Sequence, residues 1–123
     1  MSELTRLSAL EMATRLRAGT LSTRALLDAH RARTEEVNGG INAFITLGWA
    51  AAGAHADELD AMAARGSFAG PLHGLPVAVK DIFETRGLRT TWGSRSFEHH
   101  VPGFDALHVA RLRTAACRRT GAP

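Results

Sequence analysis

One lysine stands out among the residues of this chain that could do chemistry. Fourteen of the fifteen basic residues are arginine, and Lys80 is the only lysine. It follows Val77-Ala78-Val79, an apolar run that predicts a buried strand, so we expect its amine to be at least partly buried. Burial disfavours the charged form of a lysine and lets the amine accept a proton, whereas arginine stays protonated. Lys80 is therefore a candidate general base; a solvated ammonium, or one paired with Asp81, remains the alternative.

The residues around Lys80 form a long motif with fixed spacing. A Gly/Pro loop, Gly70 to Pro76, leads into the strand that ends in Lys80-Asp81, and Thr90-Thr91-Trp92-Gly93-Ser94 follows. This pattern resembles the amidase signature family, whose members share G-P-L-x-G-x-P-x-x-x-K-D and then T-T-x-G-S. The resemblance spans roughly residues 42–115 and includes the segment from Asp105 to Arg113.

The resemblance implies hydrolysis of a carboxylic amide C–N bond by a Ser–cis-Ser–Lys mechanism. Lys80 would accept a proton through a bridging serine while a second serine attacks the carbonyl and forms an acyl-enzyme, which water then cleaves. Backbone donors would hold the oxyanion. The implied partner is a small-molecule amide substrate in the complete enzyme, and no metal or organic cofactor is implied.

The sequence departs from the family pattern in its serines. No Gly/Ser-rich segment of the type G-S-S-G-G-S lies between Lys80 and Pro123. Ser94 and Ser96 are tempting substitutes, but Ser94 belongs to the T-T-x-G-S element, and we assign it a structural or turn role. The resemblance also ends after Arg113. We therefore expect a truncated amidase that is inactive alone. The alternative is a non-catalytic α/β module that needs a partner chain to complete its sheet.

The elements that must position Lys80 follow from periodicity and capping residues. Helices are predicted from Ser8 to Gly19, from Ser22 to about Val37, over 49–65 and over 105–116, and strands over 41–47 and 77–82. The expected fold class is α/β: the amino-terminal part of the amidase signature fold, with helices flanking a partial mixed β-sheet. We expect one partial domain, 1–123, with a helical segment (1–40), the start of the α/β core (41–116) and an atypical tail (117–123).

Composition excludes several functional classes. The net charge is only +3 although the pI is 10.4, and the arginines are scattered among acids, so we expect no nucleic-acid partner. The single cysteine excludes an internal disulfide framework. No apolar run is long enough for a membrane span and no secretory signal is visible, so we expect a cytoplasmic location. A homo-oligomer or a complementing chain remains possible.

The other candidate residues have ordinary interpretations. His99, His100 and His108 match no zinc spacing and are interpreted as surface residues. His73 is interpreted as a packing residue, and Cys117 as a spectator. For Asp81, orientation of Lys80 and a hydrogen bond from strand to loop are equally open, and Thr90 and Thr91 are expected to shape the loop.

Overall fold

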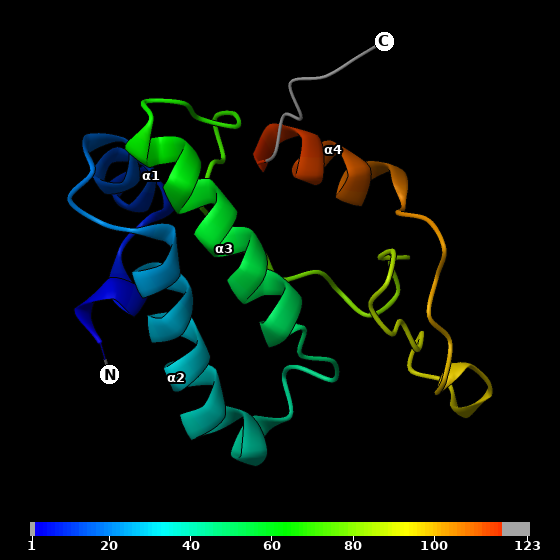
Figure 1. Cartoon of the computed structure of the whole chain (residues 1–123). Coiled ribbons are helices and arrows are strands. Elements are labelled where there is room, and N and C mark those ends of the chain that lie inside the picture. The colour runs from blue at the N-terminus through cyan, green and yellow to red at the C-terminus, as the bar shows by residue number, and fades with distance from the viewer. Residues whose placement is uncertain (1, 117–123) are drawn as a thin grey trace, which may run out of the picture.

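The computed structural model describes residues 2–116, which form helices and irregular loops (Figure 1). The elements are η1 (Glu3–Arg6), α1 (Ala9–Ala18), α2 (Thr23–Ile41), α3 (Trp49–Ala64), η2 (Arg95–Phe97) and α4 (Leu107–Ala116). No β-strand occurs in this described range, so the predicted α/β class with a partial mixed sheet is wrong.

The first helix confirms the capping signals in the sequence. The Ser8 side chain accepts a hydrogen bond from the Glu11 amide, and the Glu11 carboxylate accepts one from the Ser8 amide. These bonds satisfy backbone donors that a helix start leaves free, which is why α1 begins here. Hydrogen bonds from Ser8 also lower the pKa of Glu11. Gly19 ends the helix with φ 72°, a left-handed conformation that glycine adopts without steric cost.

The second helix is longer than its sequence predicts. It begins after Ser22 as expected but continues through Gly39 and Gly40 to Ile41. The end is set by Asn42, which has φ 49° and caps the helix in the left-handed conformation. The Asn38 side chain accepts from the Phe44 amide at 2.8 Å and donates to its carbonyl at 3.0 Å. These bonds stabilise a helix end that lies further along the chain than helix propensity alone predicts.

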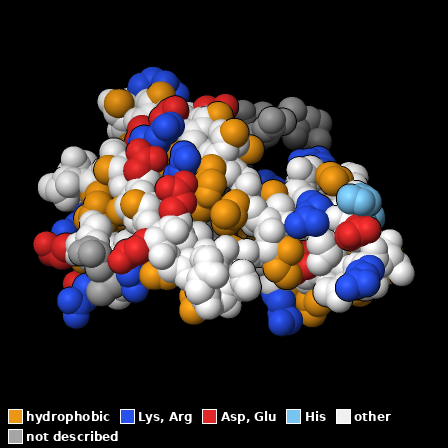
Figure 2. Space-filling model, turned by 90° about the horizontal axis from the view of Figure 1, so that it is seen from below, with side chains coloured by type: hydrophobic (Ala, Val, Ile, Leu, Met, Phe, Trp, Pro, Cys, Tyr) orange, Lys and Arg blue, Asp and Glu red, His pale blue; other side chains and the backbone are white. Residues whose placement is uncertain are grey.

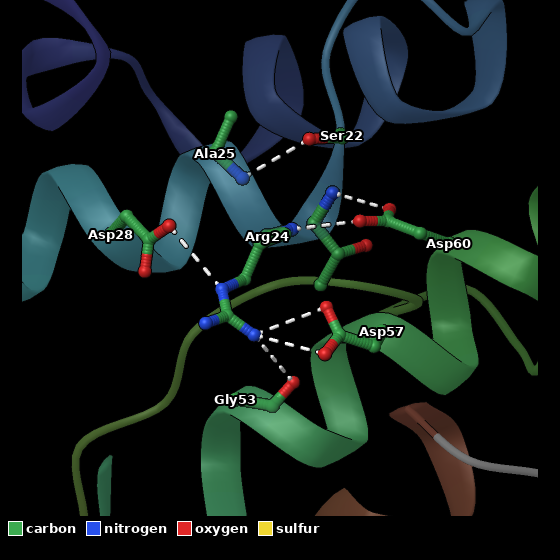
Figure 3. Close-up of polar contacts among 8 residues, drawn as sticks. Ser22, Arg24, Ala25, Asp28, Gly53, Asp57 and Asp60 are labelled. Atoms are coloured by element: carbon green, nitrogen blue, oxygen red, sulfur yellow. Dashed lines mark hydrogen bonds and ion pairs between the residues drawn. The ribbon is translucent and has the colours of Figure 1, made fainter. Parts of the chain in front are cut away.

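Helices α2 and α3 lie side by side and are joined by polar contacts at their facing surfaces (Figures 1 and 3). Asp60 of α3 accepts hydrogen bonds from the amides of Thr23 (2.6 Å) and Arg24 (2.9 Å) at the start of α2. The Arg24 guanidinium contacts the carboxylates of Asp57 (2.9 Å) and Asp28 (3.2 Å). These carboxylates raise the pKa of Arg24, and Asp57 has the largest effect.

The apolar core lies between α1 and α2. Its fully packed members are Met12, Leu16 and Leu26, and partly buried leucines close it from η1, the α1–α2 turn and the loop after α3. Helix α3 contributes Ala56 and Leu59, both buried. The apolar periodicity of the sequence predicts Leu16 and Leu26 in this core but misses Met12. It also predicts Leu10 on the apolar face, and Leu10 is 78% exposed.

Both predicted strands are irregular in the structure. A strand requires a neighbour to complete its hydrogen-bond ladder, and within residues 2–116 neither segment has one. Segment 41–47 instead begins inside α2 and is held by Asn38. In segment 77–82, the Lys80 carbonyl accepts from the Phe83 amide at 3.0 Å and forms a turn. The alternation in 41–47 and the apolar run in 77–82 therefore predicted strands that the described part of the chain does not form.

Candidate functional site

Lys80 lies in the long connection between α3 and α4, at the junction of segment 77–79 and a turn. Its side chain is exposed, and no ion pair joins it to an acidic residue in the part of the chain described. The expectation that Lys80 is at least partly buried is therefore wrong for this structure. The physical reason is that no sheet encloses the segment before Lys80. Val77 is 51% exposed, and Ala78 is also exposed.

Asp81 connects the two halves of the sequence motif. Its carboxylate accepts hydrogen bonds from the Thr91 amide, at 2.8 Å, and from the Thr91 hydroxyl, while its carbonyl accepts from the Trp92 amide at 2.9 Å. Partial burial by itself raises the pKa of Asp81, but the hydrogen bonds from Thr91 and from the Gly93 amide outweigh it and lower the pKa. Of the two roles left open for Asp81, the structure confirms the hydrogen bond to the loop.

Glu84 fixes the remainder of the Thr-Thr-Trp-Gly-Ser element. Its carboxylate accepts from the Trp92 indole N–H at 2.9 Å and lies 3.0 Å from His100 Nε2. Trp92 has φ 57°, which is unusual for a bulky residue and is held by its backbone and side-chain hydrogen bonds. Sequence reasoning missed Glu84 because its partners lie 8 and 16 residues away, with no local periodicity to link them.

The loop is tied to α4 through Asp105. One carboxylate oxygen accepts from the Arg86 amide at 2.7 Å and the other lies 2.9 Å from Arg113 Nε. The Ala106 amide donates to the Glu84 carbonyl at 2.7 Å. The predicted helix cap at Asp105 is therefore replaced by a contact between loop and helix, and α4 begins at Leu107.

The remaining candidates occupy structural positions. Ser94 Oγ accepts from the Ser96 amide at 3.3 Å and caps η2, which confirms its turn role. The three histidines do not converge: His99 is largely exposed, His100 contacts Glu84, and His108 stacks edge-on with Phe83 at 4.1 Å. Residues 2–116 contain no group of His, Cys, Asp and Glu that could hold a metal ion. Cys117 lies outside the described residues.

His73 is buried, which confirms its interpretation as a packing residue. Its Nδ1 accepts from the Ala69 amide at 3.0 Å, a role that requires the neutral ring with the proton on Nε2. Burial lowers the pKa of His73, with the Leu59 carbonyl opposing the effect. It borders a cleft of about 270 Å³ lined also by Leu16, Thr23, Asp60 and Phe68. No residue from 77–105 lines this cleft, so it is separate from Lys80.

Comparison with known proteins agrees with the motif. The family model described as Amidase matches residues 25–120. The chain belongs to the amidase family. Its relatives include the A subunit of glutamyl-tRNA(Gln) amidotransferase from Streptomyces coelicolor, 39% identical over 94% of this chain, and that from Anaeromyxobacter sp. strain K, 42% identical over 92%. Each alignment covers 23% of the relative, so the chain spans about a quarter of the length of these amidase-family proteins.

Solved structures have a similar fold over most of this chain. A structure titled "Crystal structure of amidase" superposes with a TM-score of 0.81 and 34% identity, over 90% of this chain and 25% of that one. A vestigial protein complex described as revealing the origins of an s-triazine catabolic enzyme gives 0.83 at 33% identity, over 90% of this chain and 25% of that one. A bacterial aryl acylamidase of the amidase signature family, 21% identical, shares the fold with a TM-score of 0.82 over 90% of this chain and 24% of that one.

No helix among the described residues combines the length and apolarity needed to cross a membrane.

Proposed function

We propose that this chain supplies the proton-accepting lysine of an amidase that hydrolyses carboxylic amide C–N bonds. The observation that supports it most is the Asp81–Thr91 contact, which joins the Lys-Asp end of the motif to the Thr-Thr-Trp-Gly-Ser element. Because Asp81 directs its carboxylate to Thr91, the neighbouring Lys80 amine is left without an acidic partner in the described part of the chain. An amine free of such a partner is available to a serine hydroxyl.

In the proposed reaction the Lys80 amine accepts the hydroxyl proton of the bridging serine. The bridging serine in turn accepts the hydroxyl proton of the attacking serine. The attacking oxygen bonds to the amide carbonyl, the C–N bond breaks, and the leaving nitrogen takes up a proton. Water then cleaves the acyl-enzyme to the carboxylic acid and restores the serine. Lys80 is the one member of this set whose position in the family motif is present here. We infer that the 123-residue chain alone has no amidase turnover.

The first test measures ammonia release from small carboxamides by the purified 123-residue chain. We expect none above background. Hydrolysis that is abolished by Lys80→Ala overturns the proposed inactivity, because the chain would then contain its own nucleophile.

The second test asks whether Lys80 acts as a base. A chimera carries residues 25–116 of this chain in place of the matching stretch of the solved amidase that is 34% identical. On a carboxamide that this amidase hydrolyses, we expect Lys80→Ala and Lys80→Arg each to lower kcat/KM about 100-fold or more. Arg95→Ala serves as the control, since Arg95 is exposed in η2. A Lys80→Arg chimera that keeps full activity contradicts the proposal, because arginine cannot accept the proton.

A further inference from the structure

The last turn of α2 contains an Asn-Gly pair, Asn38-Gly39, in which the asparagine side chain readily loses its amide as ammonia. The reaction needs a following backbone nitrogen that can approach the asparagine side chain, and glycine has no Cβ to obstruct that approach. Asn38 and Asn42 are the only asparagines of the chain, Asn42 precedes alanine, and glutamine is absent. The chain therefore has one side-chain amide suited to this reaction and one that serves as an internal comparison.

Water reaches the Asn-Gly pair from the surface of the molecule. Gly39 and Gly40 are both exposed, and no other part of the described chain lies within 4 Å of the place that a Cβ would take at either glycine. This end of α2 lies at the bottom of Figure 1 and faces the viewer in Figure 2. Because glycine disfavours a helix interior, two successive glycines make this turn the part of α2 that opens most easily.

Asn38 holds this turn closed through three hydrogen bonds. Its carbonyl accepts from the Asn42 amide at 2.7 Å. Its side-chain oxygen accepts from the Phe44 amide at 2.8 Å, and its side-chain nitrogen donates to the Phe44 carbonyl at 3.0 Å. The amide group that the reaction removes therefore joins the end of α2 to the segment that follows it.

We propose that Asn38 is a site of spontaneous deamidation, and that the loss of its amide releases the last turn of α2. When the turn opens, the Gly39 amide gives its proton to hydroxide, and its nitrogen bonds to the side-chain carbonyl carbon of Asn38. The bond from that carbon to the side-chain nitrogen breaks, and this nitrogen takes up a proton from water and leaves as ammonia. Water then opens the resulting imide ring at one of its carbonyls, which leaves aspartate or isoaspartate at position 38.

Both products disfavour the observed end of α2. A carboxylate has no N–H to donate to the Phe44 carbonyl, so this hydrogen bond is replaced by two oxygens that face each other. Negative charge is unfavourable near the C-terminus of a helix, and the last turn of α2 has no basic residue to offset it. Isoaspartate also lengthens the backbone by one carbon, which shifts the hydrogen-bond register of the turn. We therefore expect α2 of the converted chain to end near Val37.

The test incubates the purified 123-residue chain for several weeks at physiological temperature in mildly alkaline buffer. Cleavage after arginine releases the peptide 34–65, which contains both asparagines, and mass spectrometry with fragmentation locates the converted residue. We expect Asn38 to convert at least tenfold faster than Asn42. In urea, where α2 is unfolded, we expect Asn38 to convert several times faster than in the folded chain.

Two glycine variants separate the reaction from the stability of the helix. Gly39→Ala places a methyl group beside the attacking nitrogen, and we expect it to slow conversion at least tenfold. Gly40→Ala is the matched control, because alanine favours the helix equally there but the Asn38-Gly39 pair is kept. We expect this control to slow conversion by no more than about fivefold, which is the effect of the helix preference alone. Equal slowing by the two variants contradicts attack by the Gly39 nitrogen.

Hydrogen exchange measures the release of the turn. The amides of Asn42 and Phe44 are expected to exchange at least tenfold faster in the converted chain than in the fresh chain. Three results overturn the proposal: no conversion of Asn38 over this period, conversion of Asn42 at the same rate, or unchanged exchange of these two amides after conversion. Conversion of Asn38 at one rate in buffer and in urea contradicts the protective role of the turn. None of these outcomes depends on Lys80 or on the proposed function.

Discussion

Asp81 and Thr91, ten residues apart in sequence, are joined by two hydrogen bonds that use both oxygens of the Asp81 carboxylate. The Thr91 amide donates to one oxygen and the Thr91 hydroxyl to the other. This contact holds Asp81, the neighbour of Lys80, against the residue that precedes Trp92-Gly93.

Removal of the Thr91 hydroxyl is expected to weaken this contact. Thr91→Val keeps the shape of the side chain but leaves the Asp81 carboxylate without one donor, which costs about 1 kcal/mol of unfolding free energy. Thr91→Ser, which keeps the hydroxyl, is the matched control. Urea denaturation of the three proteins measures the difference, and a Thr91→Val variant as stable as the original chain would show that the hydroxyl does not contribute.

The same contact predicts a dependence on acid. Because the pKa of Asp81 is lowered in the folded chain, its stabilising effect is present above the unfolded value of about 3.9 and is lost as pH falls through the folded value. Asp81→Asn removes this titration. We expect the difference in unfolding free energy between the two proteins to shrink below about pH 4. A difference that stays constant from pH 7 to pH 3 contradicts the assignment.

Gly70 packs against the end of α4, and a larger residue should separate them. A Cβ at position 70 would clash with the Ala115 carbonyl oxygen, which accepts a hydrogen bond from the Leu72 amide at 3.2 Å. Gly70→Ala is therefore expected to destabilise the chain by about 1–3 kcal/mol. Gly39→Ala is the control, because nothing lies near a Cβ there and alanine favours the helix by up to about 1 kcal/mol. Thermal unfolding should move the two midpoints in opposite directions.

His73 predicts a second, milder dependence on pH. Its pKa is lowered in the folded chain, so the unfolded chain binds the proton more readily, and stability falls as pH drops below the unfolded value of about 6.5. His73→Asn keeps an acceptor for the Ala69 amide but does not titrate. We expect a smaller change of unfolding free energy between pH 7.5 and pH 5 in this variant. His30, whose pKa burial also lowers, contributes in the same direction and remains in both proteins.

Two aspartates of α3 should differ in their importance. Asp60 accepts from two backbone amides at the start of α2, so Asp60→Ala leaves helix donors unpaired and costs about 1 kcal/mol or more. Among the described residues the Asp57 carboxylate pairs with the exposed Arg24 guanidinium alone, and exposed ion pairs contribute little. Asp57→Ala should therefore cost clearly less in urea denaturation. Equal losses would show that the ion pair contributes as much as the backbone capping, and a larger loss in Asp57→Ala would contradict the prediction.

The sequence by itself determined the helices, because helix signals are local. Ser8, Glu11 and Gly19 set the bounds of α1 through contacts within a few residues, and apolar spacing placed Leu16 and Leu26 in the core. The family was also recognisable from the sequence, since the two parts of the motif have fixed spacing along the chain. The packing role of His73 and the turn role of Ser94 followed from the same local reasoning.

Tertiary structure decided what depends on distant partners. Segments 41–47 and 77–82 have strand-forming residues, but a strand exists only with a neighbour, and none is present in the described chain. The exposure of Lys80 follows directly from that. Glu84, Asp60 and Asp105 acquired their roles from amides, rings and guanidinium groups far away in sequence, which no periodicity encodes. Local signals thus place the helices, with errors of a few residues at the end of α2 and the start of α4. Strands and polar contacts require the residues opposite them.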